Sequence, residues 1–511
     1  MARKTTVRTY NDIPYPSLVY ADTHPGKLAT LARLFGIKPP PIAKCRILEL
    51  GCGDSTNLIA IAQSLPKAEC WGIDFSAKQI AMGQSMIETI PLSNITLKAL
   101  DFNDIDDSLG QFDYIIAHGI YSWVPKEMQD TVLSLIKRHL VDNGIAYISY
   151  NTYPGWHTEN IVRDMMMYHT QQLPKLPFQM NMIQARGIVQ FLANLRQQGG
   201  EAFDVLLQEK AQQLQMMEDN YLYHDILEID NYPVYFHQFI KHIAPHRLAY
   251  VTDIEFRHYF MLSFPQQVVE AMEELFQDDF LKKEQYMDFF HNRTLRRSLL
   301  CHKKIPVTRK LEWKVVPDFY IATTLQIEKI PVNLDSEEPA QFKKADGEIV
   351  TVTHSLSKVA LLHLIQKYPQ RLSFKKLYQY VSRHLPKSYH KLTSREIVAK
   401  ELLDLYCYEA IEFYVDSSPY VTTPGAFPLA SPLARVLAAK KPQQPLINLR
   451  CEFIHLSPTA TALLPHLTGK NNRQALLEIL PQIIENPAIK PINLLLDDIL
   501  VEIAQGGLLV A

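Results

Sequence analysis

Short apolar runs alternate with stretches of helical periodicity along the first part of the chain. The runs have the length of buried parallel strands and fall at 47–50, 69–73, 95–102, 112–119 and 144–151. Between them, apolar residues recur at helical spacing over 57–65, 77–90 and 126–140. Because strands alternate with helices, the pattern predicts an α/β domain with a doubly wound parallel sheet. Such sheets bind ligands beyond the carboxyl ends of their strands.

The segment 160–232 has a different pattern, with helices expected at 162–172, 181–195 and 202–217. Four methionines here are interpreted as core or subunit packing, Met165, Met166, Met167 and Met182. The stretch 221–239 is dense in aromatic residues and histidine. His224 and His237 have no acid or cysteine at a metal-like spacing, so we interpret them as structural and expect no metal site.

From about residue 306 the pattern changes again. Short strands are expected at 311–316, 348–352 and 411–415, and helices at 355–366, 373–383 and 394–406. Three helices and a strand are typical of a winged helix, so 306–420 is interpreted as a winged-helix-like middle domain. Basic and acidic residues are mixed there, which favours a protein-interaction or structural module over a DNA-binding one. A C-terminal helical domain, 421–511, follows with helices at 459–467, 472–484 and 491–505.

Composition narrows the class of protein. The chain of 511 residues is long enough for two to four domains. Its residues are 47% hydrophobic and 21% charged, which is typical of globular proteins. The net charge of −2 gives no electrostatic reason to expect nucleic acid as a partner. No apolar run is long enough for a membrane span, and the N-terminus lacks the apolar region of a secretory signal. The six cysteines form no Cys-x-x-Cys pair and indicate reduced thiols in the cytoplasm.

The run ILELGCGDS combines the end of a strand with a sharp turn. Gly51 and Gly53 allow the chain to turn and backbone N–H groups to approach a ligand. The next strand ends at Asp74, where a carboxylate usually accepts hydrogen bonds from both hydroxyls of a ribose. A glycine pair alone also marks ordinary strand–helix turns, and Ser55 takes the place of the third glycine of the dinucleotide-binding pattern. Glu49, just before the glycines, favours a cofactor site.

The run ILELGCG followed by GID resembles the class I S-adenosylmethionine-dependent methyltransferases. In that class, an acidic residue and a Gly-x-Gly turn after the first strand border the methionine part of the cofactor. The resemblance implies S-adenosylmethionine as cofactor and a Rossmann-like sheet of seven strands, the last antiparallel. Only five strands precede residue 160, so the other two are expected at 248–256 and 295–302, with intervening helices at 236–244 and 266–276. The segment 160–232 is then an insertion.

Further cofactor contacts are expected beside the glycine turn. Asp101 ends the third strand next to Phe102, and this pair suits an adenine. The carboxylate would accept a hydrogen bond from the adenine amine, and the phenyl ring would stack on the adenine ring. The alternative for Asp101 is a cap on the segment 104–109. The complete set of expected cofactor residues is Tyr15, Glu49, Gly51, Gly53, Asp74, Phe75, Asp101, Phe102 and His118.

The N-terminal segment 7–28 carries aromatic residues and prolines. It is interpreted either as an arm that packs on the following domain or as a lid over the cofactor cleft. A lid needs aromatic area to exclude water, and Tyr10, Tyr15 and Tyr20 supply it.

Several motifs together resemble one family more closely. They are Thr23-His24-Pro25, HGIYSWVP at 118–125, SYNTYPGW at 149–156, EQYMDF at 284–289, Asn292-Arg293 and LLCH at 299–302. This resembles the bacterial methyltransferases with a methyltransferase regulatory domain, including the rickettsial-type lysine methyltransferases of outer-membrane proteins. The resemblance implies a core domain, a helical dimerisation domain, a middle domain and a C-terminal domain. We place the core domain at 1–159 and 233–305, of which 233–305 is the regulatory region, and the helical dimerisation domain at 160–232. The middle domain is placed at 306–420 and the C-terminal domain at 421–511.

Aromatic residues follow the fourth and fifth strands, where an acceptor should arrive: Tyr121, Trp123, Tyr153 and Trp156. Aromatic faces attract an ammonium or sulfonium by cation–π contact, worth ~0.5–2 kcal/mol each. Ordinary loop packing is the alternative. His118 is a candidate proton relay, although the family provides no firm base.

These observations favour a homodimeric lysine N-methyltransferase acting on a bacterial outer-membrane or surface protein. The roughly 200 residues beyond the catalytic domain favour a large substrate over the alternative, a small-molecule methyltransferase. A second alternative is an inactive S-adenosylmethionine-binding regulatory protein. The acidic residues and glycines at the first three strand ends count against that alternative.

Overall fold

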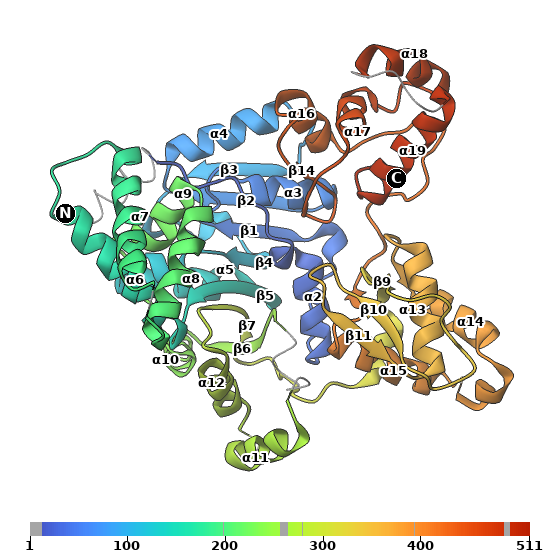
Figure 1. Ribbon diagram of the computed structural model, residues 1–511, viewed down its shortest axis with the longest axis horizontal. Coiled ribbons are helices and arrows are strands. Elements are labelled where there is room, and N and C mark those ends of the chain that lie inside the picture. Colours follow the sequence, from blue (N-terminus) through green and yellow to red (C-terminus); the bar gives the residue numbers. More distant parts are fainter. Residues whose placement is uncertain are drawn as a thin grey trace.

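A seven-stranded mixed sheet forms the centre of the computed structural model, which describes residues 13–197, 199–255, 264–277, 279–392, 394–484 and 491–510 (Figure 1). Its strands are β1 Arg46–Leu50, β2 Glu69–Asp74, β3 Ile95–Ala99, β4 Phe112–Ala117, β5 Leu140–Asn151, β6 Leu248–Asp253 and β7 Leu295–His302. They lie in the order β3-β2-β1-β4-β5-β7-β6, and β7 is antiparallel to both of its neighbours. The predicted seven-stranded class I methyltransferase sheet is therefore confirmed.

Alternating side chains divide the sheet's core into two layers. Ile47 faces α2 Pro25–Leu34, α3 Thr56–Ser64 and α4 Ala77–Glu88, whereas Leu48 faces α5 Lys126–His139 and α10 Phe236–Ile243. Both side chains are fully buried, and each such burial contributes ~1.5–3 kcal/mol. Helices on both faces explain why these strands are continuous apolar runs rather than alternating ones.

The third strand is shorter than predicted. It ends at Ala99, and the 3₁₀ helix Phe102–Asp104 follows. The Asp101 side chain accepts a hydrogen bond from the backbone N–H of Asn103 at 2.9 Å and so caps this turn. A short polar side chain that bonds its own backbone competes with the ladder, which explains the early end of the strand.

The helical insertion consists of α6 Gly155–Gln171, α7 Phe178–Leu195, α8 Ala202–Met216 and α9 Asp219–Leu222, which lie together at one end of the sheet (Figure 1). They enclose a small core of their own. Met166 and Met182 are fully buried in it, and Met165 and Met167 pack against it. The interpretation of these methionines as packing residues agrees with this arrangement.

The chain beyond β7 forms a mixed module. Its helices are α13 Ser355–Lys367, α14 Phe374–His384 and α15 Arg395–Cys407, and its strands are β8 Tyr320–Ala322, β9 Gln326–Ile327, β10 Ala340–Lys343, β11 Ile349–Val352, β12 Leu372–Ser373 and β13 Glu412–Tyr414. The strand expected at 311–316 is wrong, because Trp313–Asp318 is a 3₁₀ helix. Pro317 has no N–H to donate to a ladder, and Val316 is the one fully buried residue of that segment.

The C-terminal helices have a separate core. They are α16 Pro432–Lys440, α17 Pro458–Leu463, α18 Arg473–Ile483 and α19 Ile492–Gln505, with the hairpin β14 Leu446–Ile447 and β15 Phe453–Ile454. Gln63 of α3 ties this part to the sheet domain, since its Oε1 accepts hydrogen bonds from the Ser431 hydroxyl and the Leu433 N–H. Among the described residues, no helix is both long and apolar enough to cross a membrane.

Candidate cofactor and acceptor site

The turn after β1 has the conformation of a glycine-rich cofactor loop. Gly51 and Gly53 both have positive φ, and a Cβ on Gly51 would lie 2.0 Å from Cδ1 of Ile120. Ser55 also has a left-handed backbone, with φ of 63°, and its N–H donates to the carbonyl of Cys52 at 2.8 Å. The loop therefore follows a glycine-like path even though serine replaces the third glycine.

Asp74 and Glu49 lie on either side of this turn. Asp74 Oδ2 accepts from the N–H of Gly53 at 2.9 Å, and Oδ1 accepts from that of Ser76 at 2.8 Å. Glu49 Oε1 accepts from Asn57 Nδ2 at 2.8 Å, whereas the buried Oε2 has no hydrogen-bond partner among the described residues. Burial raises the pKa of Glu49 to about 7 and also raises the pKa of Asp74.

These groups fit S-adenosylmethionine. An unpaired carboxylate oxygen is costly to bury and is available for a cationic ligand group. Each Asp74 oxygen accepts one backbone N–H, which leaves acceptor capacity for ribose hydroxyls. Phe75 is 36% exposed and Phe102 is half-buried, so both rings retain accessible surface near Asp101.

The N-terminal arm lies against this turn and against the helical insertion. Ser17 Oγ donates to Asp54, and the Tyr20 N–H donates to Asn57 Oδ1 at 2.9 Å. Tyr15 Oη donates to Asp225 Oδ1 at 3.1 Å, and burial raises the pKa of Tyr15. Tyr15 and Tyr20 are thus on the segment that bridges the two parts, whereas Tyr10 lies outside the described residues.

His118 is enclosed by two tyrosines. Its ring lies 3.8 Å from that of Tyr20, and Nδ1 is 2.9 Å from the hydroxyl of Tyr147. Burial lowers the pKa of His118 to about 3. The imidazole is neutral at physiological pH and too weak a base for efficient general-base catalysis, which favours a positioning role.

The loops after β4 and β5 bring two of the four predicted acceptor aromatics into contact, Trp123 and Trp156, and place Tyr153 in a separate ring contact. The rings of Trp123 and Trp156 meet edge-on at 6.2 Å, and Tyr153 stacks on His157 at 4.1 Å. Tyr121 differs from its expected place at the entrance. It is 1% exposed, packs on Tyr150 and Phe239, and its hydroxyl bonds to His242.

Two residues of this region are absent from the sequence-based set. Tyr235 lies 5.2 Å from Tyr153, and Asn231 Oδ1 accepts from the side chain of Asn151 at 2.9 Å. Both come from the aromatic stretch 221–239, whose composition is the signal that could have identified them. Its isolated bridge to β5, between Thr152 and Val234, explains how the stretch reaches the strand end.

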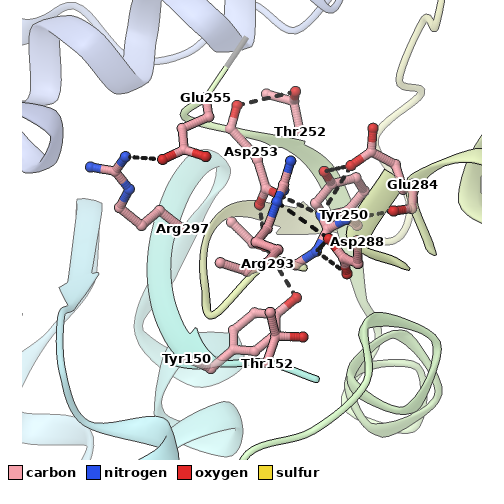
Figure 2. A network of polar contacts seen from close by, with 12 residues as sticks. Tyr150, Thr152, Tyr250, Thr252, Asp253, Glu255, Glu284, Asp288, Arg293 and Arg297 are labelled. Carbon is pink, nitrogen blue, oxygen red and sulfur yellow. Dashed lines mark hydrogen bonds and ion pairs between the residues drawn. The ribbon is translucent and has the colours of Figure 1, made fainter. Parts of the chain in front are cut away.

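A buried ionic network supports the end of β5 (Figure 2). Arg296, which is fully buried, pairs with Asp253, Glu284 and Asp288, and Arg293 pairs with Asp253 at 2.9 Å. The carbonyl of Arg293 accepts from the N–H of Gly155 at 3.0 Å. A Cβ on Gly155 would lie 2.5 Å from that oxygen, so this close approach requires glycine.

Three family models match the chain. They are "Methyltransferase domain" at 42–220, "Predicted methyltransferase regulatory domain" at 218–302 and "PKMT, C-terminal winged helix domain" at 427–493. From the sequence we expect a winged helix, but at 306–420 rather than at the matched residues. Both segments contain helices joined by short strands, so hydrophobic periodicity does not distinguish them.

Relatives align with nearly the whole chain. Protein RP789 of Rickettsia prowazekii is 32% identical over 481 residues, which cover 92% of this chain and 85% of RP789. PKMT2 from Rickettsia typhi superposes with a TM-score of 0.86 at 27% identity, covering 97% of this chain and 100% of PKMT2. PKMT2 from Rickettsia typhi in complex with AdoHcy superposes with a TM-score of 0.85 at 27% identity, covering 98% of this chain and 100% of PKMT2. This chain therefore belongs to the family of RP789 and is an S-adenosylmethionine-dependent methyltransferase with a regulatory domain and a C-terminal winged helix.

Proposed function

We propose that this enzyme methylates lysine side chains of a bacterial outer-membrane or surface protein. The observation that carries the proposal is two pairs of aromatic rings after β4 and β5, Trp123 with the buried Trp156 and Tyr153 with Tyr235, which we propose form one aromatic wall. A similarity over 97% of the chain to a structure called PKMT2 supports it. We also propose that the enzyme acts in the cytoplasm, since its six cysteines are all free and buried.

Within this proposal, Glu49, Gly51, Gly53 and Asp74 hold the cofactor at the first two strand ends. Asp101, Phe102 and Phe75 border its adenine, and Tyr15 and His118 close the site from the arm and from β4. Bound S-adenosylmethionine supplies a methyl group on a cationic sulfonium. The protein's part is to orient the acceptor, to exclude water and to favour the neutral amine.

An aromatic wall serves an incoming lysine in two ways. Its faces attract the ammonium form by ~0.5–2 kcal/mol per contact while the side chain enters. Partial removal of water then lowers the pKa of the lysine, so that its proton passes to solvent water and the lone pair becomes available. Tyr121 is left out of this wall because its ring lies in the core.

We further propose a homodimer formed through α7. Met180, Ile183, Phe191 and Leu195 recur at helical spacing on this helix and are between 44% and 68% exposed. An open groove of about 790 Å³ runs beside Ile183, Gly187 and Phe191. Contiguous exposed apolar residues of this kind mark interaction sites, and a second copy of the same face is the simplest partner.

The substrate class can be tested with labelled cofactor. The full chain is incubated with methyl-labelled S-adenosylmethionine, first with fractionated bacterial envelope proteins and then with the small-molecule extract of the same cells. We expect label in protein and none above background in the small-molecule fraction. Label confined to small molecules would contradict the proposal, and cofactor binding in calorimetry without label in either fraction would indicate an inactive relative.

A further inference from the structure

Two histidines and an aspartate from α5, α10 and the turn after α10 converge on one point of the surface. Asp130 lies on α5, His242 in the last turn of α10 and His246 in the turn that leads to β6. Asp130 Oδ1 is 3.0 Å from Nε2 of His242 and 3.1 Å from Nε2 of His246. Among the described residues this is the one set of three histidine, cysteine or acidic side chains whose ligand atoms lie within 4.8 Å of one another.

The spacing of these atoms suits a metal ion. In a tetrahedral zinc site with bonds of 2.0–2.1 Å, neighbouring ligand atoms lie about 3.3 Å apart. The two nitrogen–oxygen distances are close to that value. Two imidazoles and one carboxylate are a common zinc ligand set, and the 58% exposure of the Asp130 side chain leaves room for a water as fourth ligand.

The other nitrogen of each ring is also held. His242 Nδ1 lies 2.5 Å from the hydroxyl of Tyr121, and His246 Nδ1 lies 3.2 Å from that of Ser134. A hydroxyl donates to an unprotonated Nδ1 or accepts from a protonated one. When Nε2 binds a metal, Nδ1 carries the proton and donates to the same hydroxyl, as in second-shell contacts of zinc sites. Both rings are therefore oriented for metal binding without rearrangement.

We propose that Asp130, His242 and His246 bind one Zn²⁺ ion. The ion joins α5 to the turn after α10, and through the His242–Tyr121 bond it is linked to the loop 118–125 beside the acceptor aromatics. It acts as a structural clamp.

The test uses full-length, tag-free protein treated with a chelator, dialysed and titrated with zinc chloride in a calorimeter. We expect one ion per chain, at least tenfold weaker binding in His246→Ala, and unchanged binding in His455→Ala, which removes an exposed histidine of the C-terminal region. Zinc should raise the thermal midpoint of the wild type and not that of His246→Ala, whereas Mg²⁺ should raise neither.

A second variant and a spectroscopic measurement complete the test. Asp130→Asn changes an exposed side chain and should fold, and we expect it also to bind zinc at least tenfold more weakly. X-ray absorption of the zinc-loaded wild type should show imidazole scattering from two histidines. Equal zinc affinity in wild type and both variants, or no stoichiometric binding by the wild type, would overturn the proposal.

Discussion

At the scale of single residues, Asp74 has one structural role that its contacts show and one role in cofactor binding that we propose. It fixes the glycine turn through the N–H groups of Gly53 and Ser76, and we assign it the ribose hydroxyls. Asp74→Ala should lose about 1.5–3 kcal/mol for hydrogen bonds to a charged group, which is roughly tenfold or more in cofactor affinity. Calorimetry with S-adenosylmethionine measures this. Asp104→Ala, an exposed carboxylate nearby, is the control, and an unchanged affinity in folded Asp74→Ala would refute the assignment.

Glu49 predicts a pH dependence of cofactor binding. Because burial raises its pKa to about 7, the side chain is mostly neutral at pH 6 and mostly ionised at pH 8. A cationic cofactor favours the ionised form, so affinity should rise with pH over this range, by at most about tenfold per unit. Glu49→Gln cannot ionise, so its affinity should lack the rise with pH that comes from Glu49. The pH dependence that remains in this variant measures titration of the cofactor itself. Identical pH profiles for both proteins would exclude Glu49 from the cofactor site.

The residue scale also shows where the sequence is informative. Glu49, the glycines and Asp74 were predictable because a strand end followed by a sharp turn fixes their position. The direction of the Tyr121 side chain was not predictable, because its hydroxyl partner, His242, lies 121 residues further along the chain. His242 and His246 were overlooked, although a His-x-x-x-His spacing was present as a signal.

At the scale of elements, the ionic network around Arg296 joins β6, β7 and α12 Phe280–His291 beside the end of β5 (Figure 2). Arg296→Met would leave Asp253, Glu284 and Asp288 without their main partner, and breaking a buried pair costs about 3–5 kcal/mol. Arg297→Met is a matched control on the same strand, because its side chain is 27% exposed and its pairs with Asp22 and Glu255 should be worth below about 1 kcal/mol. Urea unfolding compares the two. Equal losses of stability would contradict a supporting role for the network.

The elements themselves were largely predictable. Strands buried on both faces are continuous apolar runs, which is why the first five strands could be derived from the sequence pattern. The sixth and seventh strands were expected because of the resemblance to the class I methyltransferases. The segment 311–316 also contains apolar residues, but the 3₁₀ helix Trp313–Asp318 replaces the expected strand, since the backbone beside Pro317 cannot complete a ladder. The network around Arg296 had no sequence signal, because its charges are spread from Asp253 to Arg296 and meet only after folding.

At the scale of the whole molecule, the exposed apolar face of α7 predicts self-association. Ile183→Glu places a charge at the centre of that face and should shift the protein from dimer to monomer at micromolar concentration, as measured by light scattering. Val501→Glu, on an exposed position of α19, should leave the mass unchanged. A wild-type monomer at the same concentration would refute the dimer.

The position of the methyl group is the most direct test of lysine methylation. Envelope proteins treated with the enzyme and labelled cofactor are digested and analysed by mass spectrometry. We predict methyl groups on lysine Nζ, an at least tenfold lower rate in Trp123→Ala at unchanged cofactor affinity, and a near-wild-type rate in Tyr121→Phe, whose ring lies in the core. Methyl groups on other atoms, or a wild-type rate in Trp123→Ala, would contradict the proposed function.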